Sequence, residues 1–363
     1  MNLQPDTTEL LARARADLRM GVAVVLCNAD QAAIMVAAET LSAGRLAEIQ
    51  GLGGSAVLTI TARRAQTLKA RAYDGDVARI ILPDDASLPW IHGIADPADD
   101  LMMPMKGPLQ SMRGGDATLH HAAISLAKSA RLLPAALVVD IACGAEFAAS
   151  HNLTLIDLTK TSGLLTTSSL LAPVASARLP LAVSETGRLH VFRPADGGEE
   201  HYAVEIGQID RAKPVLVRLH SACFTGDLLG SLKCDCGPQL RASMAQMGDE
   251  GAGVLLYLNQ EGRGIGLANK MRAYSLQDQG FDTVEANHRL GFEDDERDFR
   301  IGADILKRMG ISQIRLLTNN PKKVEMMQAE GLIVTDRVPL KVGHTTQNAE
   351  YLRTKANKSG HLL

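Results

Sequence analysis

Short apolar runs alternate with amphipathic stretches along the first half of the chain. The stretches at residues 38–50 and 119–133 space their apolar positions as a helix does. Four apolar runs have the length and composition of buried strands: residues 22–27, 56–61, 78–82 and 136–141. This alternation predicts a layered α/β domain.

Three apolar runs in the second half each end in a polar cluster. Residues 214–219, 253–258 and 314–317 lead into His-Ser, Gln-Glu-Gly-Arg-Gly-Ile-Gly and Thr-Asn-Asn-Pro-Lys-Lys, respectively. Pro321, in the third cluster, suits the first position of a helix, where its missing N–H costs nothing. Because strand ends form the usual ligand crevice of an α/β sheet, these clusters indicate a binding site.

The chain of 363 residues is long for one compact domain, and its character changes near residues 172–186. We therefore expect an α/β (α+β) protein with two domains, residues 1–172 and 173–363, each a mixed sheet flanked by helices. Residues 97–116 are rich in Met, Pro and Gly and predict a long loop. A disordered excursion and a functional lid are equally open interpretations of this loop.

The overall charge excludes one class of partner. Lys+Arg 38 against Asp+Glu 41 gives a net charge of −3, which offers no general basic field for nucleic acid. No apolar run approaches the roughly 18 residues of a membrane span, and the N-terminus does not read as a leader peptide. We therefore expect a cytoplasmic protein that binds neither nucleic acid nor membranes.

Three of the five cysteines form the pattern C-x10-C-x-C at Cys223, Cys234 and Cys236. Thiolates select zinc or a related soft ion, and three protein ligands leave a fourth position for water, as catalytic zinc sites require. His220 is a possible fourth ligand, which would close the site and make it structural. The residues alone favour the two kinds of zinc site equally. The other cysteines, at positions 27 and 143, lie in apolar runs and are expected in the core.

Other polar residues have ordinary structural interpretations when taken singly. The glycines of Glu-Gly-Arg-Gly-Ile-Gly suit close approach to a phosphate, with charge from Arg218, Arg263 and Lys323, but they suit a tight turn equally well. Asp295 alone would cap the helix predicted after it, and Arg297 would be a solvated charge. Tyr274 alone would be a half-buried aromatic residue.

The second half carries many separate motifs in one order. They are His-Ser, C-x10-C-x-C, GPQL, NQEGRGIGLANKMRAYSLQDQG, DTVEAN, DDERDF and LLTNNPKK. From about residue 179 onward this sequence resembles GTP cyclohydrolase II, the first enzyme of riboflavin biosynthesis. The resemblance implies a hydrolase that converts GTP to 2,5-diamino-6-ribosylamino-4(3H)-pyrimidinone 5′-phosphate, formate and pyrophosphate. It also implies Mg²⁺ with the triphosphate and a homodimer.

The resemblance also implies roles for residues. Cys223, Cys234 and Cys236 would hold one zinc ion per subunit and leave the fourth position to water. Asp295 would be the proton acceptor and Arg297 the nucleophile toward the α-phosphorus, with Tyr274 near the guanine. Because a guanidinium is ordinarily protonated, stabilisation of transition-state charge is a competing role for the arginine. The implied nucleotide-binding residues are Arg218, Leu219, His220, Ser221, Ala222, Gln239, Glu261, Gly262, Arg263, Thr283, Thr318 and Lys323.

Two positions depart from the family pattern. Ala222 stands where the family commonly has Glu, and Asn259 where it usually has Arg. Neither change removes an implied zinc ligand or reacting group. A guanine-nucleotide-binding regulator without turnover therefore remains an alternative.

The first half more faintly resembles 3,4-dihydroxy-2-butanone 4-phosphate synthase. The acidic loop with which that family holds Mg²⁺ is replaced here by Cys27-Asn-Ala-Asp30-Gln, and its Gly-His-Thr-Glu falls on Thr118-Leu-His-His121. One aspartate cannot replace a carboxylate cage for a hard cation, so we predict a degenerate, inactive synthase domain rather than a bifunctional enzyme. The matching stretches include Gly21-Val-Ala-Val-Val, Ala37-Ala-Glu39, Leu133-Pro-Ala-Ala-Leu-Val and Phe147-Ala-Ala-Ser-His151.

Overall fold

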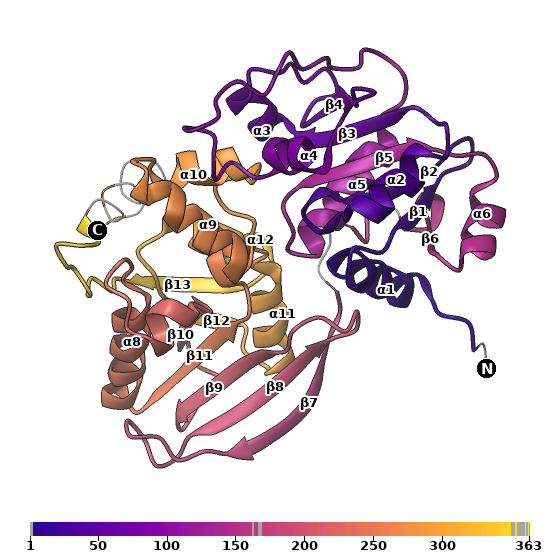
Figure 1. The fold of residues 1–363 in the computed structure, drawn as a ribbon. Helices are drawn as coiled ribbons and strands as arrows, with labels where there is room; N and C mark the ends of the chain where they lie inside the picture. Colours follow the sequence, from indigo (N-terminus) through magenta and orange to yellow (C-terminus); the bar gives the residue numbers. More distant parts are fainter. Residues whose placement is uncertain are drawn as a thin grey trace. The chain divides into compact units, whose positions relative to one another are not determined.

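The computed structural model describes residues 3–161, 163–165, 169–349, 353, 360 and 362. They form two compact units. The first unit comprises Met1–Thr167 and Ala268–Asp295, and the second Ser168–Leu267 and Glu296–Leu363. Each is built on one mixed sheet flanked by helices, which confirms the predicted fold class (Figure 1). Within the described residues, no helix combines the length and apolar character that crossing a bilayer requires.

The first unit contains a six-stranded sheet with the order β4-β3-β5-β2-β1-β6. Of its pairs, β1 with β6 is parallel and the others are antiparallel. The strands are β1 (Val24–Cys27), β2 (Ala32–Ala37), β3 (Ala56–Thr61), β4 (Val77–Ile81), β5 (Ala135–Asp140) and β6 (Thr154–Asp157). All four predicted strands are thus confirmed to within two residues, whereas β2 and β6 were not predicted.

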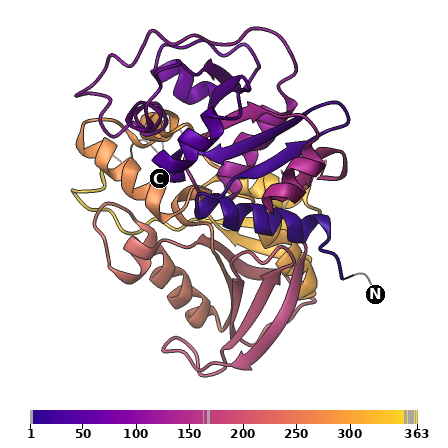
Figure 2. The ribbon, with the colours of Figure 1, turned by 45° about the vertical axis from the view of Figure 1, so that its right-hand side comes forward.

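Helices α1 and α5 supply the core on one face of this sheet. Leu18 of α1 and Leu126 of α5 are fully buried in one cluster with Leu26 and Met35 of the strands. Figure 2 shows α1, the indigo helix nearest the end marked N, beside the sheet. The helices of this unit are α1 (Thr7–Arg19), α2 (Ala43–Gln50), α3 (Ala62–Thr67), α4 (Leu88–Ala95), α5 (Thr118–Ser129), α6 (Gly144–His151), α7 (Leu158–Thr161), α9 (Leu267–Asp278) and α10 (Thr283–Leu290).

Three details of the first unit differ from or refine the sequence predictions. The helix predicted at residues 38–50 is split into a short turn, η1 (Ala38–Thr40), and α2, because Ser42 caps α2 by accepting from the N–H of Arg45. The loop at residues 97–116 contains no helix or strand. The prediction that both outlying cysteines are core residues was wrong, since Cys143 is exposed and Cys27 half-buried. Cys143 stands at the N-cap of α6 with a φ of 51°, outside the sheet.

The second unit contains a seven-stranded sheet with the order β13-β12-β10-β11-β9-β8-β7. Neighbours from β13 to β11 run parallel, and those from β11 to β7 antiparallel. The three strands predicted to carry polar clusters, β10, β11 and β12, are therefore adjacent and parallel, and their carboxyl ends lie at one edge. The strands are β7 (Leu171–Arg178), β8 (Arg188–Pro194), β9 (His201–Gly207), β10 (Val215–Ser221), β11 (Ala252–Leu258), β12 (Gln313–Leu317) and β13 (Ile333–Val338).

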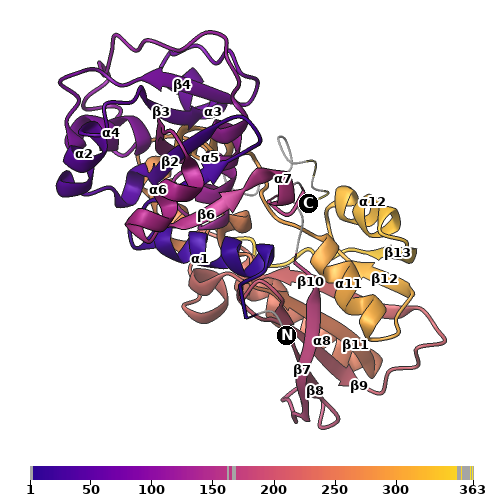
Figure 3. The ribbon, with the colours of Figure 1, turned by 90° about the vertical axis from the view of Figure 1, so that its right-hand side faces the viewer.

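Helices cover both faces of the parallel part of this sheet. Leu306 of α11 (Arg300–Arg308) packs in one core with Val217 of β10 and Leu256 of β11. These two strand residues point to the same face of the sheet. Met247 of α8 (Cys236–Glu250) packs in a second core with Leu255. Figure 3 shows α11 and α12 (Pro321–Ala329) beside β12 and β13. As predicted, proline opens α12 at its first turn.

A buried ion-pair network fastens the loop after α4 in the first unit. The Arg64 side chain is 1% exposed and donates hydrogen bonds to the carbonyl of Ile94 at 2.7 Å and to Asp100 Oδ1 at 3.0 Å. Lys106 also contacts Asp100. Burial by itself raises the pKa of Asp100, but hydrogen bonds and charge from Arg64 and Lys106 outweigh it and lower that pKa.

Asp100→Asn should lower the free energy of unfolding by about 3 kcal/mol, because it leaves a buried guanidinium without its counter-charge. The stabilisation by Asp100 is present above the unfolded carboxyl pKa of about 4 and is lost as the pH falls through the lower folded pKa. Denaturant unfolding at pH 3 and pH 7 should therefore show a smaller pH dependence in the variant. The exposed neighbour gives a control, Asp99→Asn, which should match wild type, and equal pH dependence in both variants would contradict this account.

Candidate metal centre and its surroundings

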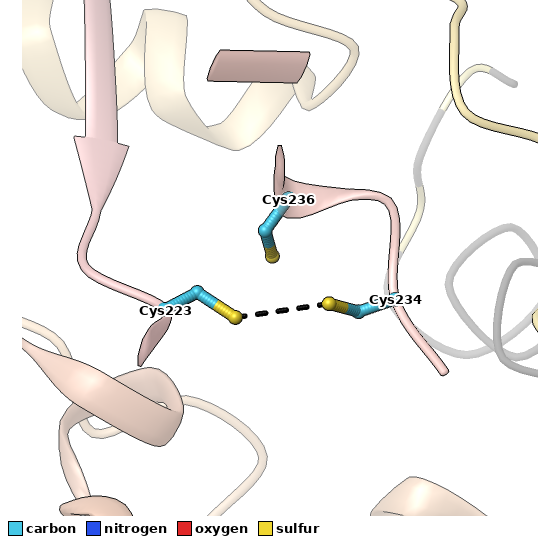
Figure 4. A group of neighbouring side chains, drawn as sticks. All are labelled: Cys223, Cys234 and Cys236. Atoms are coloured by element: carbon cyan, nitrogen blue, oxygen red, sulfur yellow. Dashed lines mark hydrogen bonds between the residues drawn. The ribbon is translucent and has the colours of Figure 1, made fainter. Parts of the chain in front are cut away.

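Three thiols meet at the carboxyl end of β10. Cys223 follows the strand, Cys234 lies in the next loop, and Cys236 is the first residue of α8 (Figure 4). Their sulfur atoms all lie within 4.8 Å of one another, and Cys223 Sγ is 3.7 Å from Cys234 Sγ. That separation far exceeds a disulfide bond of about 2.05 Å. It matches the roughly 3.8 Å between two sulfurs that each lie about 2.3 Å from one tetrahedral zinc.

The turn η2 (Phe224–Leu228) closes one side of the sulfur cluster with a glycine. A Cβ on Gly226 would lie 2.7 Å from Cys234 Sγ and 3.0 Å from Cys223 Sγ. Since real Cβ atoms essentially never approach so closely, only glycine fits here without displacing the sulfurs. The turn is therefore shaped to the cluster.

The electrostatics of the cluster also suit a cation. Hydrogen bonds with the Cys223 and Cys234 thiols, together with burial, raise the pKa of the Cys236 thiol well above its usual value. Ionisation of all three thiols is unfavourable without a cation, because each negatively charged thiolate repels its neighbours. A divalent ion at their centre would offset that repulsion, and the amino end of α8 favours a thiolate at its first residue. The three residues therefore fit zinc.

His220 is engaged elsewhere. Its Nε2 lies 3.0 Å from both carboxylate oxygens of Asp227, and its ring stacks on Tyr257 with the centroids 5.6 Å apart. Burial lowers the pKa of His220, and the contact with Asp227 offsets only part of this effect. Among the described residues, the group of potential metal ligands contains the three cysteines and not His220.

Asp227 is a central residue of this region that the sequence analysis did not single out. Its carboxylate accepts hydrogen bonds from the backbone N–H of Cys223 at 3.0 Å and from the Tyr257 hydroxyl at 3.1 Å, in addition to contacting His220. One carboxylate thus fixes the cysteine loop, the end of β10 and β11. Its position inside the cysteine motif, four residues after Cys223, was the available signal.

Arg218 of β10 and Gln239 of α8 are joined by a hydrogen bond. The buried Arg218 donates from Nη1 to the carbonyl of Leu317 at 3.0 Å and from Nη2 to Gln239 Oε1 at 2.5 Å. Burial lowers the pKa of Arg218 to about 10. These bonds join the ends of β10 and β12 to α8, so this arginine has a clear structural role.

Two further cations gather around one aromatic ring. The guanidinium carbon of Arg297 and Nζ of Lys323 lie 4.8 Å and 4.7 Å from the centroid of Phe299. Arg297 Nη1 also lies 3.4 Å from Ser221 Oγ, and Lys323 donates to the carbonyl of Leu219 at 3.3 Å. Cation–π contacts of this length are attractive. Two positive charges are thereby held at the carboxyl end of β10.

The glycine-rich segment after β11 forms a tight turn, η3 (Glu261–Gly264). Gly262 and Arg263 have φ angles of 64° and 61°, and a Cβ on Gly264 would lie 2.7 Å from the carbonyl of Glu296. Glu261 accepts a hydrogen bond from the N–H of Phe224 at 2.6 Å. The segment therefore forms a tight turn, which was one of its two predicted interpretations. This turn links the cysteine loop to the segment before Arg297.

The remaining predicted residues of the second unit lie at strand ends. Ala222 donates its N–H to the carbonyl of Leu258 at 2.8 Å. Thr318 is buried, and its hydroxyl accepts from the N–H of Asn320 at 3.0 Å. Asn259 donates from its amide to the carbonyl of Glu200 at 2.5 Å.

The other three predicted residues belong to the first unit. Tyr274 lies on α9, with Lys270 Nζ 5.6 Å from its ring centroid, and Thr283 opens α10 and accepts from Gln277 at 3.1 Å. Asp295 is exposed at the end of that unit. The prediction that Asp295, taken alone, caps the following helix was wrong. Asp298 instead accepts a hydrogen bond from the first N–H of α11 at 2.9 Å.

The chain is similar in sequence to proteins of one known enzyme family. A family model described as GTP cyclohydrolase II matches residues 172–339. The chain is 43% identical over 358 residues to GTP cyclohydrolase-2 of Azospirillum brasilense, a match covering 97% of this chain and 93% of that protein. It is 55% identical over 190 residues to GTP cyclohydrolase-2 of Proteus mirabilis, covering 52% of this chain and 95% of that protein.

These matches define the protein as an enzyme of the hydrolase class. The chain belongs to the GTP cyclohydrolase II family. A solved two-domain 3,4-dihydroxy-2-butanone 4-phosphate synthase from A. baumannii covers 92% of this chain and 99% of its own, at a TM-score of 0.33 and 17% identity. The synthase-like origin of the first half stays a prediction.

Gly226→Ala should remove the metal, because its methyl group would occupy space that the sulfurs need. Elemental analysis of purified protein should find the zinc content reduced from about one to well below about half an ion per subunit. Gly44→Ala, at a helical glycine with open space around it, is the matched control and should keep its zinc. Full zinc occupancy in the Gly226 variant would show that the thiols do not bind metal in this arrangement.

Proposed function

We propose that this protein is a zinc-dependent GTP cyclohydrolase II that opens the guanine of GTP in riboflavin biosynthesis. Its products would be 2,5-diamino-6-ribosylamino-4(3H)-pyrimidinone 5′-phosphate, formate and pyrophosphate. The observation that carries the proposal is the cluster of three thiols at the end of β10, with sulfurs within 4.8 Å of one another, in a chain of this family. By the same resemblance we propose a homodimer.

Zinc held by Cys223, Cys234 and Cys236 would supply a bound water whose pKa is near 7, and hence a nucleophile at neutral pH. The contacts of His220 support a zinc site with an open fourth position, because the Nε2 of this histidine already contacts the Asp227 carboxylate. The histidine and its carboxylate then serve to hold the cysteine loop. The fourth position would be left for water, which a catalytic site needs and a closed structural site lacks.

The triphosphate would be met by local positive charge, since the whole chain has a net charge of −3. Arg297 and Lys323, gathered by the Phe299 ring, are placed where β10 ends beside the thiols. The Ser221 hydroxyl, 3.4 Å from Arg297 Nη1, adds a hydrogen-bonding group there. Within the part of the chain that the structure describes, the three cysteines are the only group of three or more potential metal ligands, so we propose that Mg²⁺ enters with the phosphates of GTP.

Arg297 has two proposed roles, and its surroundings favour one of them. A cation–π contact with Phe299 stabilises the protonated guanidinium, which suits stabilisation of negative charge on the α-phosphate. A nucleophilic role requires the guanidinium to lose its proton. We therefore propose charge stabilisation, with Asp295 as proton acceptor and with Tyr274 and Thr283 close to the guanine.

Purified protein supplied with GTP, Mg²⁺ and zinc should release formate and pyrophosphate in equal amounts. Cys234→Ala should abolish formate release, because two thiolates no longer hold the zinc in a three-ligand site. Cys27→Ala, at a cysteine outside the cluster, is the control and should retain turnover. No formate from the wild type at any GTP concentration would refute the proposal.

The regulator hypothesis makes the opposite prediction for the same protein. Calorimetry would then detect GTP binding without turnover, and Ala222→Glu, which restores the usual family residue, would not create activity. Binding together with formate release excludes this alternative.

We propose that the first unit has no synthase activity. The acidic loop of the synthase is replaced by a tight turn between β1 and β2, in which Asn28 Oδ1 accepts from the N–H groups of Asp30 and Gln31 at 3.0 and 2.7 Å. Such a turn offers one carboxylate where a hard cation wants several oxygen ligands.

Ribulose 5-phosphate incubated with the full chain and Mg²⁺ should therefore remain unchanged under conditions in which GTP is consumed. The measurement is the amount of ribulose 5-phosphate left after GTP turnover is complete. Its conversion to a four-carbon phosphate and formate would show instead that the enzyme is bifunctional.

A further inference from the structure

Helices α9 and α10 belong in sequence to the matched family region, yet they are part of the first compact unit. Helix α10 packs against α3. At its end the hydroxyl of Thr61 donates to the carbonyl of Gly291 at 2.8 Å. A Cβ on Gly291 would lie 2.9 Å from Pro134 Cγ, so the backbone approaches the residues of the first half closely there.

Arg272 of α9 makes two contacts with the first half of the chain. It donates from Nη2 to Glu39 Oε1 at 3.0 Å and from Nε to Asp96 Oδ2 at 3.1 Å. Glu39 is itself fixed, because its other oxygen accepts from the N–H of Leu133 at 2.7 Å. Beside it the fully buried Asn269 donates to the carbonyl of Arg131 at 3.0 Å.

Polar contacts make up part of the attachment of α9. Two of the four buried residues of α9, Asn269 and Lys270, are polar, so the helix is not held by an apolar stripe alone. The ion pair of Arg63 with Glu293 is 39% and 51% exposed and adds little. Arg272 and Glu39 are 26% and 19% exposed, and they form the better shielded pair.

We propose that the first half of the chain positions α9 and α10. Glu39 and Asp96 are the positioning residues, and they act through their contacts with Arg272. The sheet would then be kept after loss of its acidic loop because it orders the helices that carry Tyr274 and Thr283. This inference rests on the proposed function for the part that these two residues play in GTP binding. The attachment itself is independent of the reaction.

The test uses full-length protein carrying Glu39→Gln and Asp96→Asn together. Hydrogen exchange of amides in residues 268–295 should become faster, and the KM for GTP should rise by about 10-fold with a smaller change in kcat, because loosened helices bind the nucleotide less well. Zinc content should stay at the wild-type value. Glu48→Gln, at an exposed residue of α2, is the matched control and should change none of these quantities.

A double-mutant cycle separates positioning from general damage. If Glu39 acts through Arg272, then Arg272→Gln should raise KM as Glu39→Gln does, and combining both should add little. Unchanged exchange in residues 268–295, or additive effects in the cycle, would overturn the inference. If wild-type protein does not turn over GTP, the proposed function fails, and the exchange measurement still decides whether the first half holds the helices.

Discussion

The close approach of three cysteine sulfurs is the constraint on which the proposed site depends. Sulfurs within 4.8 Å of one another can ionise together only around a cation. The surrounding chain is shaped to that requirement: Gly226 leaves room for the sulfurs, and Asp227 holds the backbone of Cys223. The same carboxylate engages His220, which would otherwise be a competing ligand.

The parallel strands bring further polar and charged residues to the edge at which the thiols lie. Because β10, β11 and β12 are adjacent and parallel, their polar ends meet at one edge beside the thiols. Phe299 gathers Arg297 and Lys323 there, which gives local positive charge in a chain that is slightly acidic overall. In the proposed function, metal chemistry and phosphate recognition would share one set of strand ends, as α/β folds commonly arrange.

Sequence patterns predicted strands that are apolar and mostly buried, including all three at the site. They did not predict β7, β8 and β9, which keep many residues exposed or only half-buried. They also did not predict β2 and β6, and they wrongly placed Cys27 and Cys143 in the core. The cysteine spacing predicted a metal centre but left His220 open as a ligand. Only its contact with Asp227, which depends on the local turn, weighs against that role.

Long-range contacts were the least predictable part. Nothing in the sequence near Arg272 indicates that its partners are Glu39 and Asp96, since each is an ordinary surface-type residue far away in the chain. Likewise, the sharing of Phe299 by two cations depends on how α11 and α12 pack on the sheet. The family motifs identify residue types, whereas the fold decides which of them meet.

The most direct test of the central claim is X-ray absorption at the zinc edge of the purified full-length protein. The account predicts three sulfur neighbours at about 2.3 Å and one oxygen neighbour at about 2.0–2.2 Å, without the outer-shell scattering of an imidazole. An imidazole in the coordination shell, a fourth sulfur, or no bound zinc would contradict an open three-thiolate centre.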